Sequence, residues 1–372
     1  MVRLLSILII LSALTGCQQK APQKDEVIDS ERLGQMLVVG FRGTEIDQDH
    51  PLVKDLKEFN LGGVILYDYD YELESFGRNI ESQDQLLKLS SDLIANAPIS
   101  PIIAVHHDGG FQSPLTNLYD DLQTLEKGFL QDSSSAVSYS RKYAQEFRVL
   151  NLNTNFNPRL DLQTPTANAP NSEIISSNPE VVTQQADYIL DEYDKELLFS
   201  VPKYFPGYSS DYHPTDSTND VTDVWTDDFL QPYRALLSSD REIWGIMTAH
   251  SFNAHIDSVW PGTLSEKTIT GLLRDSLGFE GVILSDDLQK PIITGKYSLE
   301  TAIQQAINAG VDILVLGNNH TYDEQIAEKA IGIIQQLLRE GKVERERVEA
   351  SLARIDSLKI NVIEGLCSCM NF

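Results

Sequence analysis

Short apolar runs alternate with longer segments of helical periodicity from Ser30 almost to the end of the chain. The runs are three to five residues long and rich in Val, Ile and Leu, which is typical of strands buried on both faces. Eight strands are predicted, at 37–39, 64–67, 102–105, 152–156, 198–201, 243–247, 282–284 and 313–316.

The segments between these strands carry helix signals. Ser265 and Ser298 can each cap a helix, and Gly278 and Gly310 follow the two apolar stripes as stop signals. Pro179 suits the first turn of a third helix. Its possible caps are Ser176, Ser177 and Asn178. A fourth helix is predicted from residues that line one face, Ala136, Ser140, Tyr143, Ala144 and Phe147. Two closing helices are predicted at 323–338 and 343–358.

Eight strands that alternate with helices, without a break in composition, predict an α/β fold of the TIM type, a single (β/α)8 barrel. The main alternative is an open doubly wound sheet. The Gly-x-Gly-x-x-Gly pattern of many such sheets is absent after the first predicted strand. We therefore favour the barrel.

Polar clusters follow seven of the predicted strands, at 67–70, 106–110, 157–161, 203–207, 248–250, 286–287 and 317–320. Strand carboxyl ends meet on one face of a barrel, so the clusters predict a shared pocket. Its carboxylate, amide, hydroxyl and aromatic groups suit a polyhydroxylated ligand such as a sugar.

Asp286 and Asp287 come directly after the seventh strand. One of them, most simply Asp287, can serve as a cap or turn residue. Glycoside hydrolysis uses an ionised carboxylate and an acid that protonates the leaving oxygen, and Asp286 suits the first role. The histidines available for acid–base work are His106, His107, His213 and His250, although His250 is equally well explained as a buried framework residue.

A metal site is not expected. His106, His107 and Asp108 are adjacent on one short loop, and neighbours of this kind seldom all reach one ion. No cofactor is expected either. The net charge of −26 argues against nucleic acid as a partner and against electrostatic attachment to anionic lipid. The pattern indicates no particular oligomeric state.

The N-terminus begins Met1-Val2-Arg3 and continues with an apolar run at 4–14, which is too short to span a bilayer but suits a signal peptide. The run ends in Leu14-Thr15-Gly16-Cys17, which resembles a bacterial lipobox. The resemblance implies cleavage before Cys17, a lipid on its sulfur and anchoring in the cell envelope.

The expected divisions are a lipoprotein signal peptide at 1–16, a lipidated tether at 17–29, the barrel at 30–365 and a tail at 366–372. Cys367 and Cys369 lie in this tail. A single intervening residue is poor geometry for a disulfide between them, and no role is assigned to either.

Several motifs resemble glycoside hydrolase family 3, in particular its single-barrel β-N-acetylhexosaminidase branch, which acts on peptidoglycan fragments. The similar stretches are 33–37, 62–67, 155–158, 247–250, 273–281 and 315–319, and the most specific is Ser285-Asp286-Asp287-Leu288. In the family the Asp that follows the Ser is the nucleophile, which would be Asp286. The resemblance implies a (β/α)8 barrel and a retaining glycosidase with a carbohydrate substrate.

The chain departs from the family pattern in the residues that bind and protonate the substrate. The family's Asp-Gln-Glu-Gly-Gly stands here as 106–110, with His106 in place of the first Asp, and two expected arginines fall near Pro114 and Glu173. Lys-His-Phe-Pro-Gly-His stands as 203–208, which keeps Lys203 and loses both histidines. The Asp-Ser-His loop, whose Asp and His form the acid–base dyad, matches 216–218 and lacks the histidine.

Two hypotheses follow. The first is a lipid-anchored glycosidase with altered sugar specificity, in which Asp286 is the nucleophile and Asp216 or His213 assists proton transfer. Its predicted substrate-binding residues are Lys203, Tyr204, His106, Asp108 and His250. The second is a catalytically impaired relative that binds a glycan or a partner at the same end of the barrel.

Overall fold

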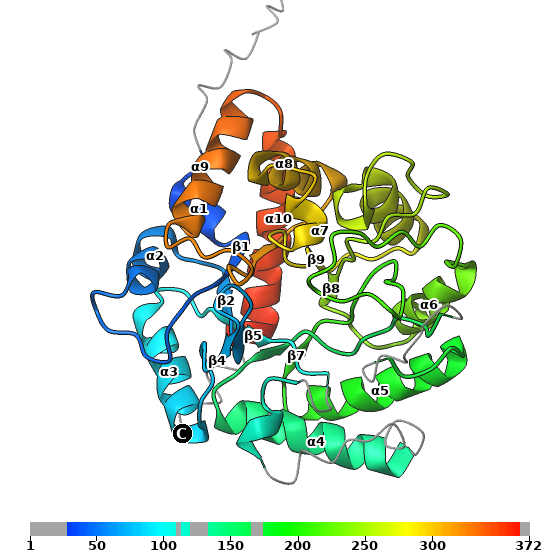
Figure 1. Ribbon diagram of the computed structural model, residues 1–372, viewed down its shortest axis with the longest axis horizontal. Helices are drawn as coiled ribbons and strands as arrows, with labels where there is room; N and C mark the ends of the chain where they lie inside the picture. Colours follow the sequence, from blue (N-terminus) through cyan, green and yellow to red (C-terminus); the bar gives the residue numbers. More distant parts are fainter. Residues whose placement is uncertain (1–27, 109–112, 120–132, 165–173, 365–372) are drawn as a thin grey trace, which may run out of the picture.

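Eight parallel strands form the centre of the protein in a computed structural model that describes residues 28–108, 113–119, 133–164 and 174–364 (Figure 1). The strands are β1 (Leu37–Gly40), β2 (Gly63–Ile65), β5 (Ile102–Val105), β6 (Thr154–Asn155), β7 (Phe199–Ser200), β8 (Gly245–Met247), β9 (Val282–Leu284) and β10 (Leu314–Leu316). Each overlaps one of the eight predicted strands, so the predicted alternation is confirmed.

The strands close into a barrel. Six pair in the order β10-β1-β2-β5-β6-β7, and β8 pairs with β9, all in parallel. Single parallel bridges, Phe205 with Thr248 and Leu284 with Ile313, join the two sections on either side. The predicted (β/α)8 barrel is therefore confirmed.

Helices surround the strands (Figure 1). They are α1 (Ser30–Gly34), α2 (Pro51–Phe59), α3 (Gln83–Asn96), α4 (Ser133–Val149), α5 (Pro179–Lys195), α6 (Gln231–Ser238), α7 (Pro291–Thr294), α8 (Leu299–Ala309), α9 (Ile326–Arg339), α10 (Arg345–Leu358), the π-helices η5 (Lys267–Ser276) and η6 (Lys359–Ile363), and the short 3-10 helices η1 (Thr116–Leu118), η3 (Asp227–Leu230) and η4 (Gly262–Leu264). None of the helices in the described part of the chain has both the length and the apolar character that a membrane crossing requires.

Several predicted helix ends are confirmed by their hydrogen bonds. Asn178, the residue directly before Pro179, caps α5, and its side chain accepts a hydrogen bond from the backbone N–H of Glu180. Ser298 caps α8, and Gly310 ends it at a φ of 118°, a conformation that favours glycine. The Ser265 hydroxyl accepts from the N–H of Thr268 at the start of η5. These polar residues therefore set where the helices begin and end.

Two features differ from the sequence expectation. A small antiparallel hairpin, β3 (Tyr69–Asp70) and β4 (Ser75–Phe76), occupies the loop after β2, which the pattern indicated only as a polar cluster. The closing helices α9 and α10 begin at Ile326 and Arg345, later than predicted. The side chain of Asp323 accepts from the N–H of Gln325, so this residue belongs to a turn that precedes α9.

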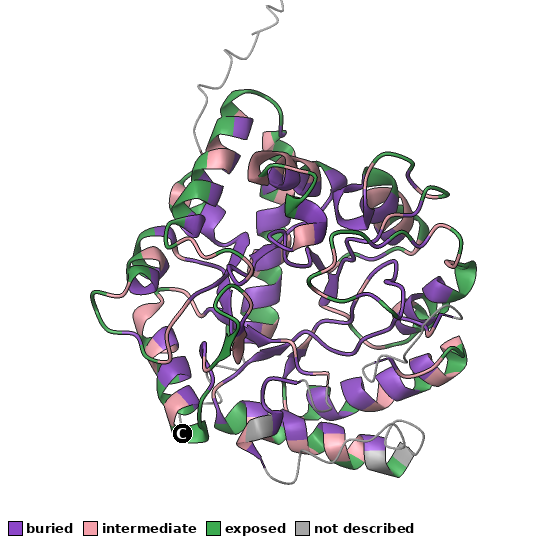
Figure 2. Ribbon diagram, in the orientation of Figure 1, coloured by how far each residue is buried: buried purple, intermediate pink, exposed green. Residues whose placement is uncertain are grey.

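Burial follows the barrel architecture. The side chains of the barrel strands are buried, apart from the half-buried Ser200, and the exposed positions lie mainly on the outer faces of the helices (Figure 2). Within 174–364, polar residues that follow the strands are also buried, among them Lys203, His250 and Asp286. Burying such groups is favourable only when they are hydrogen-bonded or paired, so their partners define the candidate site. The predicted signal peptide, Cys17, most of the tether, Cys367 and Cys369 lie outside the described residues.

Candidate active site

Asp286 lies directly after β9, and its side chain is fully buried. The Lys290 ammonium contacts both carboxylate oxygens, Oδ1 at 2.9 Å and Oδ2 at 2.7 Å. The Tyr208 hydroxyl donates to Oδ2 at 2.8 Å, and the backbone N–H of Asp287 donates to Oδ1 at 2.7 Å. These contacts hold the carboxylate in one orientation.

The charge on Asp286 is set mainly by Lys290. Burial alone would raise the pKa of Asp286, but Lys290, with smaller contributions from His250 and His106, holds that pKa far below its ordinary value. Burial would likewise lower the pKa of Lys290, whereas the carboxylate raises it. Both groups are therefore charged at neutral pH, and Asp286 has the ionised form that a carboxylate nucleophile requires.

Asp287 serves the loop that carries Asp286. Its Oδ1 accepts from the backbone N–H groups of Gln289 at 2.9 Å and Gly317 at 2.8 Å. Burial raises the pKa of this carboxyl. The second Asp of the pair therefore has the turn role that the sequence left open, and it ties the β9 loop to the end of β10.

A second charged cluster joins the ends of β5, β6 and β7. The buried Lys203 ammonium lies 2.7 Å from Asp108 Oδ2 and 3.1 Å from His106 Nδ1, and Asn157 donates to Asp108 Oδ1 at 2.9 Å. Burial and then Lys203 lower the pKa of His106. Against the effect of burial, Lys203 lowers the pKa of Asp108. Three predicted substrate-binding residues are thus brought together.

Tyr204 lies between the two clusters. The Lys203 and Lys290 ammonium nitrogens are 5.1 and 5.7 Å from the centre of its ring, and the Arg159 guanidinium carbon is 5.5 Å away. Arg159 is itself paired with the buried Asp161 at 2.6 Å. The ring of Tyr204 therefore connects the nucleophile candidate with the Lys203 cluster.

His250 is built into the framework of the barrel. Its side chain is fully buried, its Nε2 donates to the backbone oxygen of Asp287 at 2.9 Å, and its Nδ1 lies 2.9 Å from the hydroxyl of Thr263. Its backbone N–H donates to the Tyr208 hydroxyl at 2.7 Å. With both ring nitrogens engaged, His250 is better explained as a residue that positions Asp287 and Tyr208 than as one that touches substrate.

His213 and Asp216 lie together on the loop between β7 and β8. The His213 backbone N–H donates to Asp216 Oδ2 at 2.8 Å, and the exposed His213 ring contacts the Thr215 hydroxyl. Neighbouring Tyr212 stacks on Tyr208, with ring centres 4.2 Å apart and planes 7° apart. The loop is therefore anchored beside Asp286 through Tyr212, while the contacts that join His213 to Thr215 and Asp216 lie within the loop itself.

Two residues of this site were missed. The sequence does not single out Lys290, because the pattern does not show where the side chain of a loop residue points. Its spacing of four residues from Asp286 is nevertheless compatible with an ion pair. Tyr208 stands at the position of the second family histidine in the 203–208 motif, which gives no sign of its role. In the structure its hydroxyl both accepts from His250 and donates to Asp286.

The remaining sequence-based positions contribute little to this geometry. Gly109, Gly110 and Glu173 lie outside the described residues, and Pro114 is buried. Across the described ranges, no three His, Cys, Asp or Glu side chains come together as metal ligands would.

Comparisons with known proteins identify the barrel. Residues 28–358 match the family model described as the N-terminal domain of glycosyl hydrolase family 3. A β-hexosaminidase from Nitrosomonas eutropha is 31% identical over 301 residues, which are 76% of this chain and 79% of the relative. A β-hexosaminidase from Tolumonas auensis is 31% identical over 296 residues, or 76% of this chain and 83% of the relative.

Solved structures support the same fold. A β-N-acetylhexosaminidase from Beutenbergia cavernae superposes with a TM-score of 0.75 at 21% identity, over 89% of this chain and 98% of the other. A glycoside hydrolase family 3 β-N-acetylglucosaminidase from Paenibacillus has a TM-score of 0.78 at 23% identity, and the match covers 91% of this chain and 63% of that one. Because the family model spans nearly the whole described barrel, the chain belongs to glycosyl hydrolase family 3.

Proposed function

We propose that the protein is a retaining glycoside hydrolase that acts on β-linked N-acetylhexosamine or a related sugar of cell-wall or environmental glycans. The observation that carries the proposal is the position of Asp286, a buried carboxylate that follows β9 by one residue and is paired with Lys290. In a barrel of this type, catalytic groups lie at the carboxyl ends of the strands. Family membership and the β-hexosaminidases among its relatives support the reaction class.

In the proposed reaction, one oxygen of Asp286 bonds to the anomeric carbon as the glycosidic C–O bond breaks. The leaving oxygen takes a proton from His213 or Asp216. Water then attacks the anomeric carbon, gives its proton to the same group and releases Asp286. For the first step Lys290 has to give up one carboxylate oxygen, while Tyr208 and the N–H of Asp287 keep the side chain oriented.

Substrate recognition is assigned to the cluster beside Asp286. The Lys203 ammonium and the Asp108 carboxylate can exchange part of their mutual hydrogen bonding for sugar hydroxyl groups, and His106 lies next to both. Tyr204 offers an aromatic face between this cluster and the nucleophile. His250 supports the site from behind through Asp287 and Tyr208.

A catalytically impaired glycan-binding protein is the second candidate. Lys290 occupies both oxygens of Asp286, and the position of the family's dyad histidine is taken by Thr218. Loss of general acid catalysis typically slows a reaction by about 10²–10⁴-fold. A glycan-binding protein on the same barrel would tolerate both features.

Activated aryl glycosides test the proposal because their leaving groups need little protonation. We would incubate the protein with aryl β-N-acetylglucosaminide, β-glucoside and related substrates, with Asp286→Ala as the control. Release that requires Asp286, together with a glycosyl adduct on intact protein by mass spectrometry, is the expected result. Folded protein that is silent on the whole panel contradicts the enzymatic function and favours the binding protein.

We also propose that the protein is anchored to the bacterial cell envelope by a lipid on Cys17. The support is the N-terminal pattern alone, a short apolar run that ends in Leu14-Thr15-Gly16-Cys17. Metabolic labelling with a radioactive fatty acid in a bacterial host should mark the protein and should fail for Cys17→Ala. Equal labelling of the two proteins would contradict the anchor.

A further inference from the structure

Four aromatic rings form a continuous strip at the rim of the barrel. The ring centres of Phe76 and Tyr69 are 5.0 Å apart, those of Tyr69 and Tyr71 are 5.3 Å apart, and Tyr71 stacks on His320 at 4.7 Å. Tyr69 and Phe76 are paired across the β3–β4 hairpin, which places their side chains on one face. These four residues make up the aromatic strip.

The inner end of the aromatic strip lies beside the candidate active site. His320 follows β10. Burial, and then the charge of Lys290, lower the pKa of His320 to about 4, whereas the charge of Asp286 acts in the opposite direction. Asn319 binds the hairpin to the same loop through the backbone N–H of Tyr71 at 3.1 Å and the backbone oxygen of Tyr69 at 3.0 Å. The strip is therefore continuous with the end of the barrel that carries Asp286.

The outer end of the aromatic strip is exposed. Phe76 is 72% exposed, the largest value for a large hydrophobic side chain among the described residues, and Leu73 in the hairpin turn is 60% exposed. Apolar surface that is gathered in one place, rather than scattered, commonly marks a binding surface. Two such side chains on one short hairpin therefore suggest a ligand that covers them.

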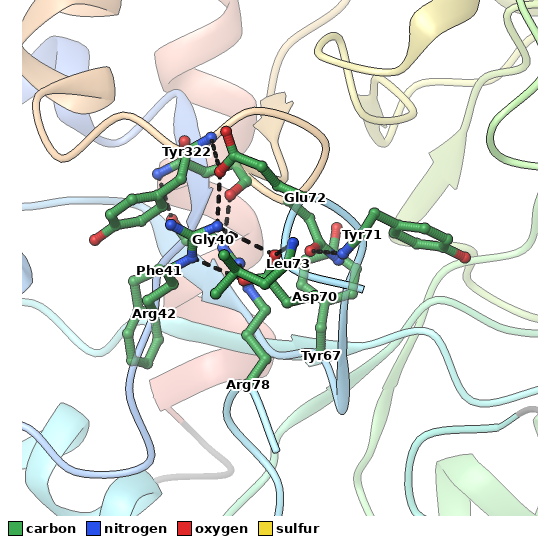
Figure 3. A network of polar contacts seen from close by, with 12 residues as sticks. Gly40, Phe41, Arg42, Tyr67, Asp70, Tyr71, Glu72, Leu73, Arg78 and Tyr322 are labelled. Atoms are coloured by element: carbon green, nitrogen blue, oxygen red, sulfur yellow. Dashed lines mark hydrogen bonds and ion pairs between the residues drawn. The ribbon is translucent and has the colours of Figure 1, made fainter. Parts of the chain in front are cut away.

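An ionic network that is buried at Asp70 and Arg78 and partly exposed at Arg42 and Glu72 holds the hairpin in place (Figure 3). Arg42 contacts Asp70 at 2.8 Å and Glu72 at 2.6 Å, and Arg78 pairs with Asp70 and donates to the backbone oxygen of Asn318 at 2.6 Å. In Figure 3 the Tyr71 side chain extends away from this network. A surface that is already ordered loses little conformational entropy when a ligand binds.

We propose that the aromatic strip binds a neutral glycan chain that extends outward from the sugar held beside Asp286. The C–H faces of pyranose rings can pack on the aromatic side chains, and the series of ring contacts is longer than one sugar. Glu72 and Glu74 in the hairpin, and the net charge of −26, disfavour uronic acid or sulfated chains. The inner end of this site rests on the proposed function, whereas the outer end rests on the hairpin.

The test is calorimetric binding in an Asp286→Asn background, which prevents turnover. The probes are the dimer and the hexamer of β-1,4-linked N-acetylglucosamine, with polygalacturonate as the anionic polymer. The hexamer should bind more tightly than the dimer, and Phe76→Ala should weaken hexamer binding about tenfold, the scale of one aromatic contact. Phe76→Tyr, which keeps an aromatic face, should retain the affinity.

Ile360→Ala is the matched control, because Ile360 is a similarly exposed apolar residue, at 64%, on η6. It should leave the affinity for the hexamer unchanged, and thermal unfolding that matches the Asp286→Asn parent excludes misfolding of each variant. Equal hexamer affinity in Phe76→Ala and its parent, or equally tight binding of polygalacturonate, would overturn the proposal. If aryl glycosides are not cleaved but the hexamer still depends on Phe76, the strip is supported and only the proposed hydrolysis fails.

Discussion

Lys290 and Asp286 form a buried ion pair in which one ammonium group lies within 2.9 Å of both carboxylate oxygens. The pair has two opposite effects on the proposed chemistry. It keeps Asp286 ionised, as a nucleophile must be, and it occupies the oxygens that would attack a sugar. The behaviour of this pair therefore determines whether the site hydrolyses glycosides or only binds them.

Replacement of Lys290 by Met should destabilise the protein by about 3 kcal/mol, because a buried carboxylate is left without its counter-charge. Without the ammonium the pKa of Asp286 should rise. The acidic limb of the pH profile of kcat/KM on aryl glycosides should then move up by about one unit or more. Urea unfolding and the pH profile provide the two measurements.

The double variant Asp286→Asn, Lys290→Met separates the pair from its members. Removal of both charges leaves neither group buried without its partner. The double variant should therefore lose less free energy of unfolding, relative to the parent, than the two single variants lose when their losses are added. Strict additivity of the two single changes would show that the two groups do not interact.

Tyr208→Phe removes a hydroxyl that donates to Asp286 and accepts from the backbone N–H of His250. The buried N–H loses its partner, so we expect a loss of about 1–3 kcal/mol in the free energy of unfolding. Tyr233→Phe is a suitable control, because the Tyr233 hydroxyl is buried and has no hydrogen-bond partner among the residues that the structure describes. A similar loss in both variants would argue against a special role for Tyr208.

The proposed proton donors can be tested by comparing leaving groups. His213→Ala and Asp216→Ala should reduce hydrolysis of an unactivated disaccharide by about 10²–10⁴-fold if the altered residue is the acid, and should affect an activated aryl glycoside much less. Ser217→Ala, an exposed neighbour in the same loop, controls for loop disturbance. Equal losses on both substrates would indicate that the loop binds sugar and does not supply the proton.

His107 should make the protein less stable in acid. Its ring is fully buried against Tyr143, and burial lowers its pKa from 6.5 to about 3. Between these pH values the unfolded chain binds a proton that the folded protein does not, so stability falls as the pH decreases below about 6.5. At pH 4 this amounts to at most about 3 kcal/mol.

His107→Gln removes this proton uptake and introduces the residue of the family pattern. Urea unfolding at pH 7 and pH 4 should therefore show a smaller acid-induced loss in the variant than in the parent. Burial also lowers the pKa values of His106 and His250, so part of the loss should remain. An identical loss in the two proteins would mean that His107 is not the group responsible.

Much of the fold was predictable because it rests on local patterns. Each barrel strand is a short apolar run, and signals such as Asn178 with Pro179, or Ser298 with Gly310, act within a few residues of their position. The β3–β4 hairpin was missed because Tyr67-Asp68-Tyr69-Asp70 has no apolar run, and it is held by distant partners, Arg42 and Asn319.

The candidate site was only partly predictable. The position of Asp286 follows from strand order. Lys203 lies with His106 and Asp108 because β7 and β5, the strands that they follow, lie on either side of β6. The direction in which a loop side chain points depends on its contacts in the folded protein, which the local sequence does not show. It decides that Lys290 turns back to Asp286, that Asp287 serves the backbone, and that both ring nitrogens of His250 are engaged in the barrel.

The division of the barrel into six strands and two has a consequence for its internal motions. Hydrogen exchange should be faster for the amides that join the two sections, such as Phe205 and Ala249, than for those of β2 in the continuous sheet. Tyr204 and Tyr208 follow β7 in one section and Asp286 follows β9 in the other, so a sugar that contacts both spans the boundary. Ligand binding should then slow exchange at this boundary, because the bound sugar would add contacts between the two sections of the barrel.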